Sequence, residues 1–234
     1  MVNKAQSWFV HVFTASGAFA GFLSLEAVIS ENIMLAFIWL SIAFFIDGID
    51  GTLARKVNVK ESIPVIEGSI IDNVVDYLNY VFIPALIIYS FNLIPQNLGL
   101  LTCFIILTVS CYTFANINLK TKDNFFVGFP ALWNILVFYL FILELSQTAN
   151  FLIIIFFSVL TFIPIKFVHP LRIERKKMLT IFMLILWGII CCLLLIEMGH
   201  QEFSFFQYKD TYFWIWIALT FYFIYLSINR TFEK

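Results

Sequence analysis

Four aspartates lie close together in a chain that carries few charges. Asp47 and Asp50 are three residues apart near the end of one apolar run, and Asp72 and Asp76 are four residues apart at the start of the next. Residues spaced by three or four share one face of a helix. Because consecutive helices with a short connection are usually neighbours, the two acidic faces can meet, and the spacing predicts a cluster of four carboxylates.

Four carboxylates at a membrane boundary repel one another unless a cation compensates them, and ionisable groups at this depth usually mark function. With oxygen ligands only, and neither Cys nor His in the two segments, a hard divalent ion such as Mg²⁺, Mn²⁺ or Ca²⁺ is favoured. Gly51, Ala54 and Gly68 lie on the same helix faces and leave room for a bulky or flat ligand.

A simpler interpretation treats the aspartates as solvated helix-end charges paired with Arg55, Lys56 and Lys60. That interpretation has to place four aspartates and three small residues in register on adjacent helices by chance. The metal site is therefore the favoured hypothesis.

The composition identifies the environment that these helices occupy. Hydrophobic residues make up 62% of the 234 residues and charged residues only 12%, against about 25% charged in a soluble protein. The 19% of aromatic residues, with 29 Phe, suits side chains that face lipid. The four cysteines show no metal-binding spacing and are interpreted as small core residues: Cys103, Cys111, Cys191 and Cys192.

The apolar runs predict an all-α polytopic membrane protein with one catalytic domain over residues 1–234. A helix needs about 20 residues to cross the hydrocarbon core. About eight runs are long enough, or nearly so: 8–29, 33–53, 70–91, 98–117, 125–145, 151–165, 179–198 and 212–228. The sixth is short, and Pro164 is expected to end it.

The basic residues predict the orientation. With eight spans, both termini lie on one side, and this side holds all of the 14 Lys and Arg residues except Lys209. Cytoplasmic loops carry the excess of Lys and Arg. The aspartates and both termini are therefore expected on the cytoplasmic side, with most loop carboxylates opposite.

At this point the residues resemble a known family, the CDP-alcohol phosphotransferases. The family's motif is D-x2-D-G-x2-A-R, a spacer, and then G-x3-D-x3-D. Every fixed position of it is occupied here, by Asp47, Asp50, Gly51, Ala54, Arg55, Gly68, Asp72 and Asp76.

The spacer, residues 56–67, is longer than in most of the family and is similar to that of the bacterial phosphatidylcholine synthases. Three other segments resemble the same subfamily, at residues 8–17, 128–134 and 164–172. The resemblance implies an enzyme of the bacterial inner membrane that transfers the phosphatidyl group of CDP-diacylglycerol to choline and releases CMP.

The resemblance also implies roles for the motif residues. Asp47, Asp50 and Asp72 would be ligands of Mn²⁺ or Mg²⁺, and Asp76 would assist them and act as the general base on the choline hydroxyl. The expected CDP-binding residues are Asp50, Gly51, Ala54, Arg55, Gly68 and Asp72.

Two further groups are weaker candidates. A quaternary ammonium binds to aromatic faces, so Tyr77, Tyr80 and Trp133 could contact choline. The basic loop 166–177 could contribute Lys166 or Arg172 to a phosphate, or could contact only anionic lipid headgroups. The sequence leaves open whether His11 faces the site or caps a helix.

Two other functions stay open. One is the same chemistry with serine, inositol or glycerol phosphate as acceptor, which a basic rather than an aromatic pocket would favour. The other is a cation transporter that uses the aspartates as an ion relay, which would need carboxylates along a path across the bilayer. Bilayer lipids are expected partners, a homodimer is a candidate assembly, and no nucleic acid is expected.

Overall fold

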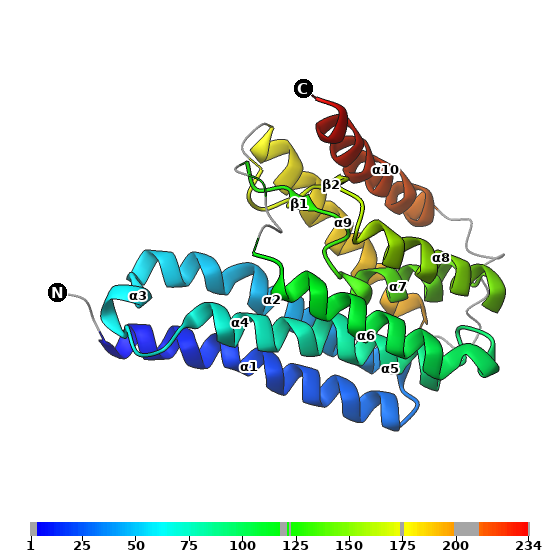
Figure 1. Cartoon of the computed structure of the whole chain (residues 1–234), viewed down its shortest axis with the longest axis horizontal. Helices are drawn as coiled ribbons and strands as arrows, with labels where there is room; N and C mark the ends of the chain where they lie inside the picture. Colours follow the sequence, from blue (N-terminus) through cyan, green and yellow to red (C-terminus); the bar gives the residue numbers. More distant parts are fainter. Residues whose placement is uncertain (1–3, 118–120, 122, 174–175, 199–210, 234) are drawn as a thin grey trace.

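The computed structural model describes residues 4–117, 121, 123–173, 176–198 and 211–233, and they form an almost entirely helical protein (Figure 1). Within these ranges six helices are long and apolar enough to span a membrane. They are α1 (Lys4–Ile29), α2 (Ile33–Val57), a third that joins α4 (Gly68–Tyr77), η1 (Leu78–Phe82) and α5 (Ile83–Ser90), a fourth that joins η2 (Gln96–Leu98) and α6 (Gly99–Ala115), α9 (Lys177–Met198) and α10 (Thr211–Phe232).

The expected spans at 8–29, 33–53, 70–91, 98–117, 179–198 and 212–228 are thus confirmed with small shifts of their ends. The basic residues Lys120, Lys122, Arg175, Lys209 and Lys234 lie outside the described residues.

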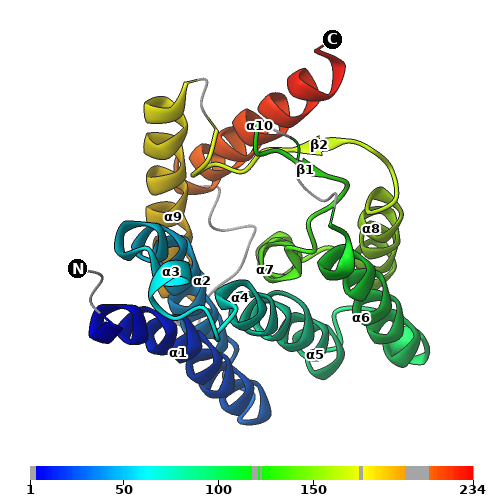
Figure 2. The same cartoon turned by 60° about the vertical axis from the view of Figure 1, so that its left-hand side comes forward.

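The two other expected spans differ from the prediction of continuous helices at 125–145 and 151–165. The structure has shorter helices, α7 (Trp133–Leu143) and α8 (Gln147–Leu160), and the count of eight spans stays a prediction. Residues 125–132 are not helical, because they contact the chain after α8: β1 (Phe126–Val127) lies antiparallel to β2 (Lys166–Phe167), and the N–H groups of Gly128 and Phe129 donate to the carbonyls of Ile165 and Leu160 (Figure 2). Hydropathy does not distinguish a buried extended segment from a helix, and such backbone is tolerated at membrane depth when protein surrounds it.

The close packing of α1 against the third span depends on two glycines one helical turn apart. A Cβ atom on Gly17 would lie 2.8 Å from Cγ1 of Val75, and one on Gly21 would lie 2.5 Å from Oδ1 of Asn79. The buried Asn79 side chain donates to the Gly17 carbonyl at 3.1 Å. Small residues spaced by four allow membrane helices to approach in this way, and here they bring the aspartates of α4 to α1 and α2.

The third span widens into a π-helical turn at η1, directly before Pro84. Proline has no N–H and its ring crowds the carbonyl four residues earlier, which is that of Tyr80. The wider turn relieves this conflict. π-bulges are frequent at functional sites, and this one carries Tyr80 one turn beyond Asp76.

β2 is held against the end of α10. The backbone N–H groups of Lys166 and Val168 donate to the hydroxyls of Thr231 and Ser227, at 2.8 and 3.1 Å. Before β1, Asp123 pairs with Arg230 at 2.5 Å. Hydrogen bonds from Arg230 and Thr121 lower the pKa of the Asp123 carboxyl to about 2, so this pair is ionised at neutral pH.

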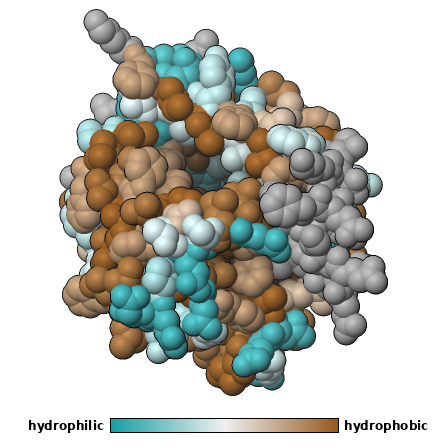
Figure 3. All heavy atoms as spheres, turned by 90° about the vertical axis from the view of Figure 1, so that its right-hand side faces the viewer, coloured by the Kyte–Doolittle hydropathy of each residue, from teal (hydrophilic) through white to brown (hydrophobic). Residues whose placement is uncertain are grey.

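The outward surface is apolar, as a bilayer requires. Phe9, Phe45, Leu100, Phe182 and Phe221 are each more than half exposed on five different helices. Brown apolar side chains cover much of the face in Figure 3. Exposed apolar surface of this extent marks contact with a membrane, and the protein is a multi-pass membrane protein.

We predict that Gly128→Ala destabilises the protein by about 1–3 kcal/mol. Gly128 has a φ of 81°, and a Cβ atom there would lie 2.3 Å from the Thr161 carbonyl oxygen. The thermal unfolding temperature in detergent measures the effect. The control is Gly188→Ala on α9, where a Cβ atom meets nothing within 4 Å; equal unfolding temperatures for both variants would contradict the prediction.

Candidate metal and nucleotide site

The end of α2 and the start of α4 form the centre of the site. α2 ends at Asn58, whose φ of 50° is the left-handed conformation that asparagine tolerates better than most residues. Its N–H bonds the carbonyls of Ala54 and Arg55 and so closes the helix. A short helix, α3 (Val59–Ser62), and a turn at Pro64 then lead to α4. The spacer 56–67 therefore folds next to the motif residues that precede it on α2 and those that follow it on α4.

Three of the four aspartates converge as the spacing predicted. Asp47, Asp50 and Asp72 each offer a carboxylate oxygen, and these oxygens all lie within 4.8 Å of one another. Asp50 is only 5% exposed, and it accepts a hydrogen bond from the Thr14 side chain of α1. α1 therefore holds one carboxylate of the cluster in place.

Asp76 and Tyr80 continue the same face of the third span. The Tyr80 hydroxyl donates to Oδ2 of Asp47 at 2.6 Å. Tyr80 is also close enough to Asp72 and Asp76 to interact with both carboxylates, and its ring lies 6.0 Å from that of Phe44. This side of the cluster combines carboxylates with aromatic rings.

The cluster fits one hard divalent ion. Opposite ligand oxygens are about 4.2 Å apart around Mg²⁺ and about 5 Å apart around Ca²⁺, so oxygens within 4.8 Å need little movement to share an ion. Carboxylates and a hydroxyl, with no thiol at the cluster, are the donors that such ions prefer.

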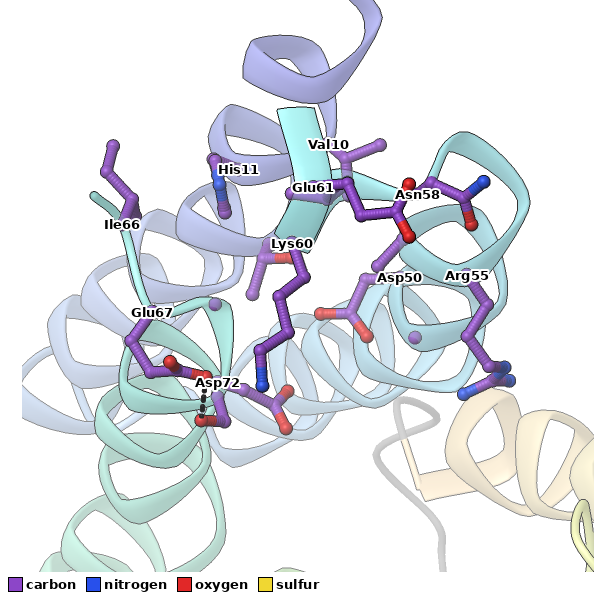
Figure 4. A pocket seen from close by; sticks show the side chains of 16 residues that line it. Val10, His11, Asp50, Arg55, Asn58, Lys60, Glu61, Ile66, Glu67 and Asp72 are labelled. Carbon is purple, nitrogen blue, oxygen red and sulfur yellow. Dashed lines mark hydrogen bonds between the residues drawn. The ribbon is translucent and has the colours of Figure 1, made fainter. Parts of the chain in front are cut away.

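A cavity of about 570 Å³ opens beside the cluster, between α1, α2, α3 and the start of α4 (Figure 4). All six residues expected to bind CDP line it: Asp50, Gly51, Ala54, Arg55, Gly68 and Asp72. Figure 4 shows Asp50 and Asp72 on two different helices with Lys60 extending from α3 between them. The cavity therefore has acidic groups at its base and a polar rim.

Two guanidinium groups flank the bare Cα of Gly51. A Cβ atom there would lie 3.3 Å from Nη1 of Arg55 and 3.6 Å from Nη2 of Arg172. Arg172 also acts electrostatically on Asp50. Arginine suits the planar, bidentate recognition of phosphate, so the cavity can bind a phosphate between the carboxylate cluster and two arginines.

The structure separates the weaker candidates. Tyr80 lies at the aspartates, whereas the Tyr77 hydroxyl donates to the Leu107 carbonyl on α6 at 2.9 Å. Trp133 is fully buried and donates from Nε1 to the Ser110 hydroxyl at 2.8 Å. The Lys166 ammonium donates to the Arg230 carbonyl at 3.3 Å. Arg172 is thus the residue of the basic loop that the described contacts bring to the cavity.

Sequence reasoning did not identify Thr14, and it left His11 undecided. Both line the cavity. They are three residues apart and so share one face of α1, which was a usable signal once the first span was expected to pack against the second. Asn58 and Glu67 also line the cavity, and only the fold of the spacer places them there.

The fold and the site together define a multi-pass membrane protein with a carboxylate cluster suited to a metal ion, beside a cavity of about 570 Å³. A family model described as CDP-alcohol phosphatidyltransferase matches residues 9–163. The chain therefore belongs to the CDP-alcohol phosphatidyltransferase family.

Curated relatives share most of the chain. The phosphatidylcholine synthase of Pseudomonas aeruginosa is 41% identical over 84% of this chain and 82% of the relative. The phosphatidylcholine synthase of Mesorhizobium japonicum is 43% identical over 79% of this chain and 69% of the relative. That of Borreliella burgdorferi is 38% identical over 87% of this chain and 85% of the relative.

We predict that the purified protein binds Mn²⁺ and that Asp50→Asn weakens this binding about tenfold or more, because it removes an anionic ligand. Electron paramagnetic resonance of free Mn²⁺ measures the dissociation constant. Binding should also weaken at acidic pH, because protons compete for the carboxylates. Asp123→Asn, outside the cluster, is the control; unchanged binding in Asp50→Asn would exclude this site.

Proposed function

We propose that the protein is a phosphatidylcholine synthase that transfers the phosphatidyl group of CDP-diacylglycerol to choline and releases CMP. The observation that carries the proposal is the cavity that joins Asp50 and Asp72 to Gly51, Ala54 and Gly68 with two arginines at Gly51. The names of the relatives support choline as the acceptor.

The cavity suits the nucleotide half of the donor. Phosphoryl transfer depends mainly on positioning and on neutralising the phosphate oxygens. Asp47, Asp50 and Asp72 would hold the divalent ion, and Arg55 and Arg172 would bind phosphate oxygens from the opposite side. The ion would neutralise the pyrophosphate and stabilise the leaving CMP. The acyl chains of the donor would remain in the bilayer beside the apolar helix surfaces.

The acceptor would approach on the Tyr80 side of the cluster. Asp47, Asp76 and Tyr80 do not line the described cavity, so the acceptor would reach the carboxylates from another side than the nucleotide. A quaternary ammonium binds to aromatic faces and to negative charge. Among the aromatic candidates, Tyr80 combines both because its hydroxyl contacts Asp47.

In the proposed reaction Asp76 takes the proton of the choline hydroxyl. The choline oxygen forms a bond to the phosphorus of the phosphatidyl group, and the bond from that phosphorus to the CMP oxygen breaks. CMP leaves with the electron pair of that bond. Attack roughly in line with the leaving group agrees with a nucleotide cavity on one side of the carboxylates and an acceptor on the other.

The proposal also includes the membrane in which the protein lies and its orientation there. We place the protein in the bacterial inner membrane with both termini and the site cytoplasmic, where CDP-linked lipid and choline are accessible. The strong Lys and Arg asymmetry of the sequence supports this orientation. A homodimer, the choice between Mn²⁺ and Mg²⁺, and the single-domain assignment stay predictions.

We predict that the purified protein, given CDP-diacylglycerol and Mn²⁺ or Mg²⁺, forms labelled phosphatidylcholine from labelled choline. Serine, inositol and glycerol phosphate should give little labelled lipid, because an aromatic and acidic acceptor site favours a cation. Thin-layer chromatography and CMP release measure the reaction. Release of CMP only with another alcohol would show that this alcohol, and not choline, is the acceptor. Absence of CMP release with every alcohol would exclude the enzyme function.

The same assay on Asp76→Asn assigns the role of that carboxylate. As a general base, Asp76 should be needed for turnover, while Mn²⁺ and CDP-lipid binding remain at least in part. Loss of Mn²⁺ binding together with turnover would show that Asp76 acts mainly as a ligand.

We predict that Tyr80→Leu raises the KM for choline about tenfold, because a cation–π contact contributes about 0.5–2 kcal/mol. Tyr80→Phe keeps the ring and should stay within about threefold of the wild type. The matched control is Tyr77→Phe, which loses only the contact to α6. A choline KM that rises equally in Tyr80→Phe and Tyr80→Leu would assign the effect to the Asp47 hydrogen bond instead.

A further inference from the structure

A polar stripe on α1 faces the interior of the protein. Ser7, His11 and Thr14 follow one another at helical spacing, and they are 0%, 6% and 7% exposed. Gly17 and Gly21 continue the stripe toward the other end of α1. Small residues on such a face are ordinary in membrane helix packing. The Ser7 hydroxyl is also buried without a hydrogen-bond partner among the described residues, but Ser7 does not line the cavity.

His11 does not fit that explanation. Its side chain is large, and its Nε2 atom is buried without a hydrogen-bond partner among the residues that the structure describes. A buried polar atom of this kind costs free energy unless some other group satisfies it. Because His11 also lines the cavity, a ligand in the cavity can supply the missing partner.

The ring lies against the first residue of α4. A Cβ atom on Gly68 would be 3.4 Å from Cε1 of His11, so the absence of a side chain at Gly68 leaves the ring edge accessible from α4. Trp8 packs edge-on against the ring, with centroids 6.2 Å apart. Figure 4 shows His11 on α1 at the edge of the cavity, apart from Asp50 and Asp72.

Helix geometry places His11 at the level of the nucleoside. Thr14, which contacts Asp50, follows His11 by three residues, and Asp72 follows Gly68 by four. At 1.5 Å per residue, His11 lies about 4.5 Å along α1 from Thr14, and Gly68 lies about 6 Å along α4 from Asp72. Ala54 follows Asp50 by four residues, so it is displaced from Asp50 by a similar distance, toward the end of α2 that leads into the spacer. With the pyrophosphate at the carboxylates, the group at this level is the nucleoside.

We propose that His11 is a specificity-determining residue whose Nε2 hydrogen-bonds to the cytosine base of the CDP-linked donor. The proposal rests on the proposed function. A neutral imidazole has one donor and one acceptor nitrogen, and in the tautomer with its proton on Nδ1 the Nε2 atom accepts a hydrogen bond from the 4-amino group of cytosine. Uracil carries a carbonyl where cytosine carries an amino group, so the arrangement that fits cytosine is mismatched with uracil.

The test compares donors as well as variants. His11→Phe keeps a ring but has no polar atom, and His11→Gln places an amide oxygen, which accepts, near the position of Nε2. With choline saturating, we expect His11→Phe to raise the KM for CDP-diacylglycerol about tenfold, as for loss of one hydrogen bond. Its preference for CDP-diacylglycerol over UDP-diacylglycerol should fall toward one, and His11→Gln should restore part of both.

Ser7→Ala is the matched control, because Ser7 is buried on the same face but does not line the cavity. It should leave the KM for both substrates unchanged, and the choline KM should stay constant in every variant. An unchanged donor KM in His11→Phe, an equal loss with both nucleotides, or a raised choline KM would overturn the proposal while the proposed function stands.

Binding of CMP and UMP to the wild type and His11→Phe, followed by thermal shift, gives a second readout without turnover. We expect the wild type to prefer CMP and His11→Phe to lose that preference. A wild-type protein that releases no CMP from CDP-diacylglycerol would overturn the proposed function instead, and one that binds CMP and UMP equally would overturn the role of His11.

Discussion

Mutual repulsion among the aspartates is the constraint on which the rest of the structure depends. Asp47, Asp50 and Asp72 present oxygens within 4.8 Å of one another in an otherwise apolar helix bundle. Like charges this close destabilise the fold unless a cation compensates them. Two helices must therefore be held together against the repulsion. The contacts of α1 provide this restraint, through Thr14 on one carboxylate and through the close approach at Gly17 and Gly21.

The same helices divide the site into two sides. Successive helical residues are rotated by about 100°, so Asp47 and Asp50, three residues apart, point about 60° away from each other. Asp50 turns toward α1 and the cavity, and Asp47 turns toward Tyr80 of the π-helical turn. One cluster of carboxylates can thus serve a nucleotide on one side and a second substrate on the other. An in-line displacement requires this arrangement.

The sequence predicted those parts that depend on short spacing or on long apolar runs. Asp47, Asp50 and Asp72 converge because three- and four-residue spacing on neighbouring helices leaves the aspartates few alternatives. The six long spans follow from hydropathy. It did not predict the non-helical segment before α7, because its contacts with the chain after α8 are tertiary contacts that composition does not encode. Arg172 was one of two phosphate candidates in the basic loop, and Thr14 was not identified, because the positions of the loop and of the first helix depend on how the bundle packs.

Arg172 shows how the two ends of the chain are joined at the site. The family match ends at residue 163, yet the Arg172 guanidinium lies beside Gly51, which lines the cavity. Two contacts hold it there. The backbone at β2 is hydrogen-bonded to Ser227 and Thr231 at the end of α10. In addition, Leu171 packs against α2, where a Cβ atom on Gly48 would lie 3.6 Å from Cδ1 of Leu171. The last helix therefore acts on the site indirectly: α10 fixes the strand, the strand fixes the loop, and the loop places a second guanidinium opposite the carboxylates.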